Sequence, residues 1–146
     1  STAIAAEMIA VPLPLKPMPS EEQIEQDAAA CADRVMAERL RRKARVRKFV
    51  GTGTTCTLPA WIWRIGDAVL IGQPNETYSA FQQELRKRFS QSAVAVMNLV
   101  NGGVGYLSPA ELHDLDIYQV WQSPFDRNAL DVLITACQQK LSEMTK

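Results

Sequence analysis

The sequence predicts an α/β fold with a partial mixed sheet that contains a βαβ unit. Two apolar runs rich in β-branched residues, 68–72 and 94–100, have the composition of buried strands. Between them, apolar side chains recur at helical spacing: Tyr78, Phe81, Leu85 and Phe89. The fold prediction is completed by a long N-terminal helix before this unit and a C-terminal amphipathic helix after it.

The composition is that of one globular unit. The chain has 146 residues, 47% of them hydrophobic, and its 16 basic and 16 acidic side chains cancel. Because a chain of this size can bury one core, we expect residues 1–146 to form a single unit. The neutral total charge argues against nucleic acid as a partner of the whole chain. No apolar run approaches the roughly 20 residues of a membrane-spanning helix.

The first third of the chain is predicted to be an extended segment followed by one helix. Four prolines between residues 12 and 19 exclude a helix there, so residues 1–19 are expected to be an extended, proline-rich lead-in. Within it, residues 3–10 fit either a helix end or a strand. Ser20 and Gln23 form a capping pair, and the helix should run to about residue 50. Its apolar stripe is thin: Ile24, Ala28, Cys31, Val35 and Met36.

The remaining elements follow from turn signals and periodicity. A strand is expected over 58–65, and the pair Gly66 and Asp67 that follows it is typical of a two-residue hairpin. The strand over 68–72 should therefore return antiparallel to it. A short helix is expected from residue 108, and the last amphipathic helix over 126–144.

The βαβ unit would place two loops at one edge of the sheet. Such crossovers are nearly always right-handed with parallel strands, and open α/β sheets bind ligands beyond the carboxyl ends of their strands. If the two strands are neighbours, Glu76 after the first and Tyr106 after the second meet at this edge. An alternative role for Glu76 is to stabilise the N-terminus of the following helix.

A basic segment over residues 39–48 indicates a different kind of function. It holds seven cations: Arg39, Arg41, Arg42, Lys43, Arg45, Arg47 and Lys48. A basic helix can bind phosphates, but cations in the last turns also complement the helix dipole. Because no aromatic residues for base stacking are interleaved, we interpret the segment as a solvated face or a contact to an acidic partner.

Few side chains are suited to catalysis or metal binding. Cys31, Cys56 and Cys137 lack the spacing of a metal site, and we expect Cys31 and Cys137 to be small hydrophobes on apolar helix faces. His113 is the only histidine. A histidine-rich metal site or a catalytic triad therefore cannot come from this chain alone.

Two motifs at the strand ends carry a family resemblance. They are Gly-x-Pro-x-Glu at residues 72–76 and Asn-x-x-x-x-Tyr at residues 101–106. In this order, with a helix and strand between them, they resemble the C-terminal part of the catalytic domain of neutral/alkaline, non-lysosomal ceramidases, most clearly over residues 64–107. Three positions differ from the family pattern. Asn75 stands where the motif has a glycine, Gly103 stands where the family usually has a tyrosine before the metal-binding one, and Gly105 stands where ceramidases have a histidine. Because asparagine tolerates left-handed backbone, we expect that conformation at Asn75.

The resemblance implies a zinc-dependent amide hydrolase that acts on an N-acyl lipid. It assigns Glu76 and Tyr106 as zinc ligands, and the loop between them is shaped by Pro74, Asn75, Asn101, Gly102, Gly103 and Gly105. The family's zinc histidines and serine nucleophile come from an N-terminal half. The implied partner is therefore that missing half of the same protein, with zinc in the intact protein and not in this chain, which would be inactive alone. Family members are often exported.

Two other functions stay open. A non-catalytic scaffold would keep the fold and lose the metal. An interaction module would use residues 39–48 to bind an acidic partner or nucleic acid, and its affinity would fall steeply with salt.

Overall fold

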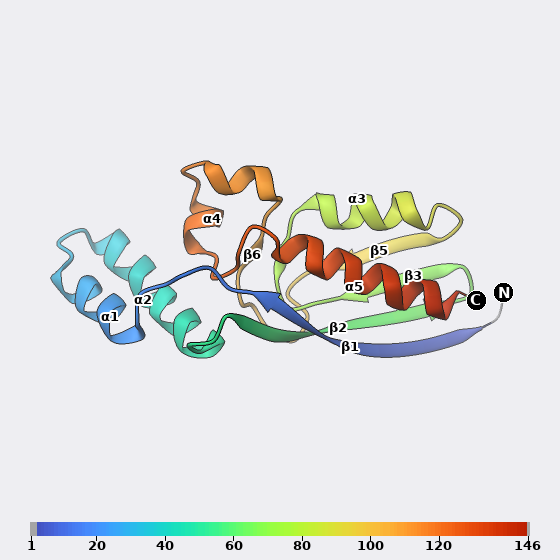
Figure 1. Ribbon diagram of the computed structural model, residues 1–146, viewed down its shortest axis with the longest axis horizontal. Coiled ribbons are helices and arrows are strands. Elements are labelled where there is room, and N and C mark those ends of the chain that lie inside the picture. The colour runs from blue at the N-terminus through green and yellow to red at the C-terminus, as the bar shows by residue number, and fades with distance from the viewer. Residues whose placement is uncertain (1–2, 146) are drawn as a thin grey trace.

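A four-stranded mixed sheet forms the body of the molecule (Figure 1). The computed structural model describes residues 3–145. The sheet has the order β1-β2-β3-β5: β1 (Ile4–Pro14), β2 (Thr55–Ile65) and β3 (Ala68–Gly72) are antiparallel neighbours, and β5 (Ala93–Met97) runs parallel to β3. The predicted α/β class, with its mixed sheet and βαβ unit, is confirmed.

The proline-rich lead-in forms an edge strand over much of its length. β1 pairs with β2 along its whole length, from Ile4 opposite Ile65 to Pro14 opposite Thr55. Because an edge strand needs backbone donors on one side alone, it tolerates prolines at positions 12 and 14. Of the two expectations for residues 3–10, the strand is therefore the one that the structure shows.

The predicted hairpin between β2 and β3 is confirmed. Gly66 has φ of 61°, a left-handed conformation that glycine adopts without steric cost and that a two-residue hairpin requires. After β3, helix α3 (Ser79–Arg88) crosses to β5. At this outer strand, Gln82 Oε1 accepts a hydrogen bond from Val96 N at 3.2 Å, and Arg86 Nε donates to Val94 O at 2.9 Å.

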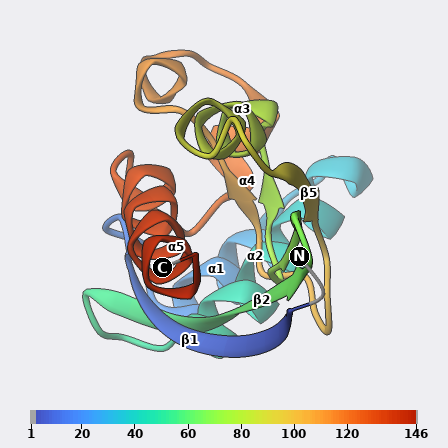
Figure 2. The same ribbon diagram turned by 90° about the vertical axis from the view of Figure 1, so that its right-hand side faces the viewer.

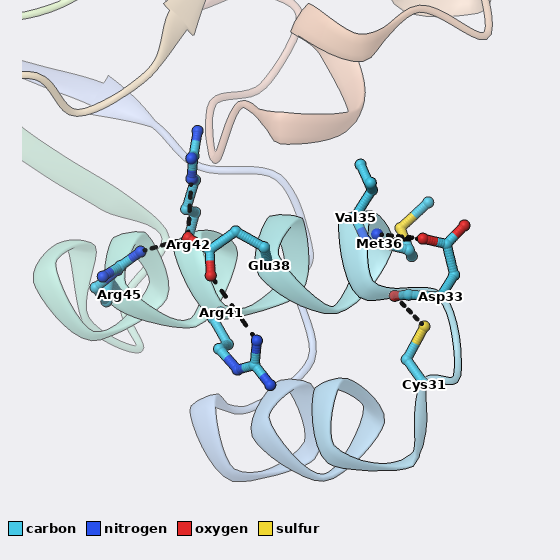
Figure 3. Close-up of polar contacts among 8 residues, drawn as sticks. All are labelled: Cys31, Asp33, Val35, Met36, Glu38, Arg41, Arg42 and Arg45. Atoms are coloured by element: carbon cyan, nitrogen blue, oxygen red, sulfur yellow. Dashed lines mark hydrogen bonds and ion pairs between the residues drawn. The ribbon is translucent and has the colours of Figure 1, made fainter.

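The prediction of one long N-terminal helix is wrong in one respect, because the segment is two helices, α1 (Glu21–Ala30) and α2 (Arg34–Val50). Between them, Asp33 Oδ1 accepts hydrogen bonds from Val35 N at 2.8 Å and Met36 N at 3.1 Å, which caps a new helix (Figure 3). Cys31 is the C-cap of α1 and is half-buried, not part of a continuous apolar face. Beyond the break, Val35 is 62% exposed.

Two helices cover one face of the sheet (Figure 2). α3 and α5 (Ala129–Met144) pack their apolar residues against the inward side chains of the strands, and the largest buried side chains of this core include Phe81, Phe125, Leu13, Ile62 and Ile71. The opposite face carries Trp61 and Trp63, both half-buried, and Met8, which is 63% exposed. This second face of the sheet is therefore apolar and open.

The last elements connect the sheet to α5. They are the short strands β4 (Glu76–Thr77) and β6 (Tyr106–Leu107), the 3-10 helix η1 (Ala110–Asp114) and helix α4 (Tyr118–Gln122). η1 takes the place of the helix expected from residue 108, whereas α4 was not predicted. None of the helices described within residues 3–145 has the length and apolar character needed to cross a bilayer.

Candidate metal-binding site

A second, two-stranded sheet brings Glu76 and Tyr106 together. β4 and β6 are parallel, and these two residues are direct partners in the register. The pairing is held by hydrogen bonds from Glu76 N to Gly105 O at 3.0 Å and from Tyr78 N to Leu107 O at 3.2 Å. Because neighbouring strands lie about 4.8 Å apart, partner side chains on one face can touch. The Glu76 carboxylate lies near enough to the Tyr106 phenol for its charge to act on that group.

The prediction that Glu76 and Tyr106 lie together required the two strands of the βαβ unit to be neighbours in the sheet. They are, since β3 and β5 pair in parallel from Ala68 opposite Ala93 to Gly72 opposite Met97. The segments that follow β3 and β5 leave the sheet at the same edge and pair with each other again as β4 and β6. α3 begins only at Ser79 and has no acidic residue in its first turn. A role for Glu76 as a first-turn carboxylate of this helix is therefore wrong.

An amide network that begins at buried Gln73 holds β4 in place, and the sequence analysis missed it. Gln73 is completely buried. Its Nε2 donates to Asn98 Oδ1 at 2.7 Å and to Asn75 O at 2.9 Å, and its Oε1 accepts from Asn75 N at 2.7 Å. Thr77 Oγ1 also donates to Asn98 Oδ1, at 2.7 Å. The one available signal was a glutamine at the end of an apolar strand, where a polar side chain needs a buried partner.

The loop before Tyr106 contains the unusual backbone of the site. Within residues 3–145, the residues other than glycine with positive φ are Leu99 at 58° and Asn101 at 55°. The expected left-handed conformation at Asn75 is therefore wrong, and Asn75 is instead 1% exposed and part of the amide network. At Leu99, this conformation lets the adjacent amides of Leu99 and Val100 donate to Asn75 O and Gln73 O.

The glycines and the proline of the loop allow close packing. Pro74, Asn101, Gly102 and Gly103 line a small, mainly apolar cavity of about 160 Å³ together with Phe49, Leu58, Pro59 and Val104. A Cβ added to Gly105 would lie 2.8 Å from Pro124 Cδ. The histidine of the family pattern therefore has no room at Gly105 in this backbone.

The electrostatics of the pair favour a protonated Tyr106. Burial raises the pKa of the Tyr106 phenol, and the nearby charge of Glu76 raises this pKa further. Tyr118 contributes to the same rise, and its ring meets that of Tyr106 edge-on at a centroid distance of 6.2 Å. Tyr106 thus keeps its hydroxyl proton beside the Glu76 carboxylate.

The pair offers two oxygen donors to a cation. Within the part of the chain that the structure describes, no three or more histidine, cysteine or acidic side chains gather into a metal site. His113 lies in η1, where burial, then Lys16 and Arg127, lower its pKa. Because a catalytic zinc site has three protein ligands, Glu76 and Tyr106 alone do not complete one.

Comparison with known proteins supports the fold. The chain matches no protein-family model and no curated protein sequence. It does resemble the solved structure of a ceramidase complexed with C2, with 10% identity and a TM-score of 0.55 over 94% of this chain and 29% of that one. Neutral ceramidase from Pseudomonas aeruginosa is similar to it with 10% identity and a TM-score of 0.54, over 93% and 27%. The chain thus has a ceramidase-like fold and spans less than a third of these structures.

Proposed function

We propose that the chain is the C-terminal portion of a zinc-dependent, ceramidase-like amide hydrolase and contributes Glu76 and Tyr106 as metal ligands. The observation that carries this proposal is the register pairing of these two residues across β4 and β6. They are 30 residues apart in the sequence, and each is the motif position at which the resembling family has a zinc ligand. The ceramidase-like fold, which extends over 94% of the chain, supports the same proposal.

The open face of the sheet supports a missing half of the same protein as the partner. Ile4, Met8 and Ile65 are 80%, 63% and 52% exposed on this face. A sheet face with large apolar side chains is normally buried against another layer. Here that layer is proposed to be the N-terminal half, which also supplies the remaining zinc ligands and the nucleophile.

The residues of this chain orient the metal ligands. Gln73 and Asn98 fix β4 against the end of β5, which sets the position of the Glu76 carboxylate. The pairing of β4 with β6 in turn sets Tyr106 beside Glu76. Bound zinc would polarise the amide carbonyl of the substrate and lower the pKa of a water molecule. Without the other ligands, the isolated chain is expected to bind no zinc tightly and to be inactive.

The test compares zinc content and hydrolysis of a fluorogenic N-acyl sphingosine in the complete protein and its variants. Glu76→Gln and Tyr106→Phe keep the side-chain shape and alter the donor atoms, and Glu84→Gln on the exposed face of α3 is the matched control. We expect about one zinc per chain, and a loss of zinc affinity of at least about 100-fold in Glu76→Gln with a parallel loss of activity.

Two results would refute the proposal. If the complete protein binds zinc and hydrolyses the amide equally well in all variants, Glu76 and Tyr106 are not ligands. If the complete protein binds no zinc and hydrolyses no amide, the non-catalytic scaffold becomes the better explanation of the fold.

A further inference from the structure

We infer that a cleft lined by arginines of α2 and by Tyr118, whose ring contacts Tyr106, binds a carboxylate or phosphate group, which makes an acidic N-acyl amide the substrate class. This arginine cleft has a volume of about 560 Å³ and is lined by Arg34, Val35, Glu38, Arg39, Arg41, Arg42 and Tyr118. Its size falls within the range of small-molecule sites. The link to a substrate rests on the proposed function, whereas anion binding by the cleft can be measured without it.

The charges in the cleft are unbalanced. Four arginines and one glutamate line it. Glu38 accepts ion pairs from Arg41 at 3.8 Å and from Arg42 at 3.2 Å, and also from Arg45 at 3.4 Å (Figure 3). A single carboxylate cannot neutralise three guanidinium groups. The arginine cleft therefore retains positive charge with Glu38 in place.

Two cleft arginines have no acidic partner. In the described part of the chain, no carboxylate lies within ion-pair distance of Arg34 or Arg39. The Arg39 guanidinium carbon instead lies 5.0 Å from the centre of the Tyr118 ring. A guanidinium stacked on an aromatic ring keeps its N–H groups free at the edge, where they can form two parallel hydrogen bonds to a carboxylate or phosphate.

Tyr118 connects the arginine cleft with the proposed metal ligands. One side of its ring faces Arg39, and it also meets the Tyr106 ring edge-on at 6.2 Å. Tyr106 pairs in turn with Glu76. One aromatic ring therefore separates a cleft suited to an anion from a pair suited to a metal. A substrate whose amide lies at the pair would place an acidic group near Arg39.

A small anion suits this surface better than a polyanion does. α1 packs against α2 and carries four acids: Glu21, Glu22, Glu25 and Asp27. Of these, Glu21 pairs with Lys48 at 3.5 Å. A nucleic acid or an anionic membrane that lay along α2 would meet these carboxylates, which repel it. A single carboxylate or phosphate group within the arginine cleft avoids them.

The first experiment measures binding of inorganic phosphate to the 146-residue chain by NMR, with the arginine side-chain signals as the readout. The double variant Arg39→Gln/Arg42→Gln removes two cleft cations, and Arg88→Gln at the exposed end of α3 removes one elsewhere. We expect the double variant to weaken binding at least about tenfold, as loss of charge-assisted hydrogen bonds does. The control should bind as the unmodified chain does.

Several outcomes would overturn the arginine cleft as an anion site. The first is that phosphate does not shift the arginine side-chain signals. The second is that the Arg88→Gln control loses as much phosphate affinity as the double variant, and the third is that the double variant binds phosphate as tightly as the unmodified chain. Phosphatidylserine vesicles and duplex DNA provide two further arms. Stronger binding to either than to phosphate would identify a polyanion surface and overturn the small-anion site.

The second experiment uses the complete protein and compares an N-acyl glycine with the N-acyl ethanolamine of the same chain length. We expect Arg39→Gln to raise KM for the acidic substrate at least about tenfold relative to the neutral one. If both substrates are hydrolysed with a KM ratio that Arg39→Gln does not change, the substrate class is wrong and the hydrolase stands. If neither is hydrolysed while phosphate still binds, the proposed function fails and the anion site stands.

Discussion

Replacement of Gly105 by alanine tests whether close packing behind Tyr106 sets the geometry of the site. The added Cβ would lie 2.8 Å from Pro124 Cδ. Because carbon atoms in contact are normally about 3.5–4.0 Å apart, the loop or the proline ring must move by roughly 0.7 Å. Gly105 O accepts the hydrogen bond from Glu76 N, so the movement would be transmitted to β4.

The expected cost follows from two terms. Forcing an extra carbon into a packed site costs about 1–3 kcal/mol. Gly105 also has φ of 157°, at the border of the region that favours glycine, which adds up to about 1 kcal/mol. We therefore expect Gly105→Ala to lower the free energy of unfolding by about 1–4 kcal/mol. For a chain of this length, that corresponds to a fall in Tm of about 3–12 °C.

The assay is urea and thermal unfolding followed by tryptophan fluorescence, with Gly103→Ala as the control. At Gly103 the nearest atom to an added Cβ is Leu99 Cδ2 at 3.4 Å, on a flexible side chain that can move away. The control should change stability by less than about 0.5 kcal/mol. The reasoning is refuted if Gly105→Ala is as stable as Gly103→Ala, because the contact with Pro124 would then cost nothing.

Two further predictions concern buried ionisable groups. Burial, and then the charge of Lys43, lower the pKa of Lys16 to about 8. Since the unfolded chain then binds more protons between pH 8 and about 10.5, stability should rise with pH across this window, by about 1 kcal/mol after solvent screening. Urea unfolding at several pH values measures this rise, and an equal rise in Lys16→Met would contradict it. Burial also raises the pKa of the Cys137 thiol to about 12. Iodoacetamide should therefore label half-buried Cys31 first. Mass spectrometry should detect labelling of Cys137 only after the chain is unfolded. Labelling of Cys137 in the folded chain as fast as that of Cys31 would disprove its burial.

Local signals in the sequence were sufficient for the βαβ unit and the hairpin. The apolar run over 68–72 and the glycine of the turn each specify a strand or its end through their own conformational preferences. The meeting of Glu76 and Tyr106 followed from topology alone, since parallel neighbours end at the same edge. These predictions succeeded because each depends on neighbours in the sequence or on one general rule of chain crossing.

The features that the sequence analysis missed depend on competition between local conformational preferences or on contacts between residues far apart in the sequence. Between Ala28 and Val35, helix propensity favoured continuation, and the capping hydrogen bonds of Asp33 outweighed it. β4 and β6 have two residues each, which is too short for a periodic pattern. Gln73 and Asn98 are 25 residues apart, and no local pattern indicates that two amides share a hydrogen bond.

The hydrogen bonds of α3 to β5 have a consequence for how this sheet can grow. The Val96 amide and the Val94 carbonyl are already occupied by side chains of Gln82 and Arg86. A further strand, whether from this protein or from a second copy, could not pair with these two positions at the outer edge of β5. At the opposite edge of the sheet, Pro12 and Pro14 lack the backbone N–H groups that a strand pairing with β1 would need. Addition of a strand is therefore disfavoured at the outer edge of β5 and over the last residues of β1, which limits how this sheet can be extended sideways.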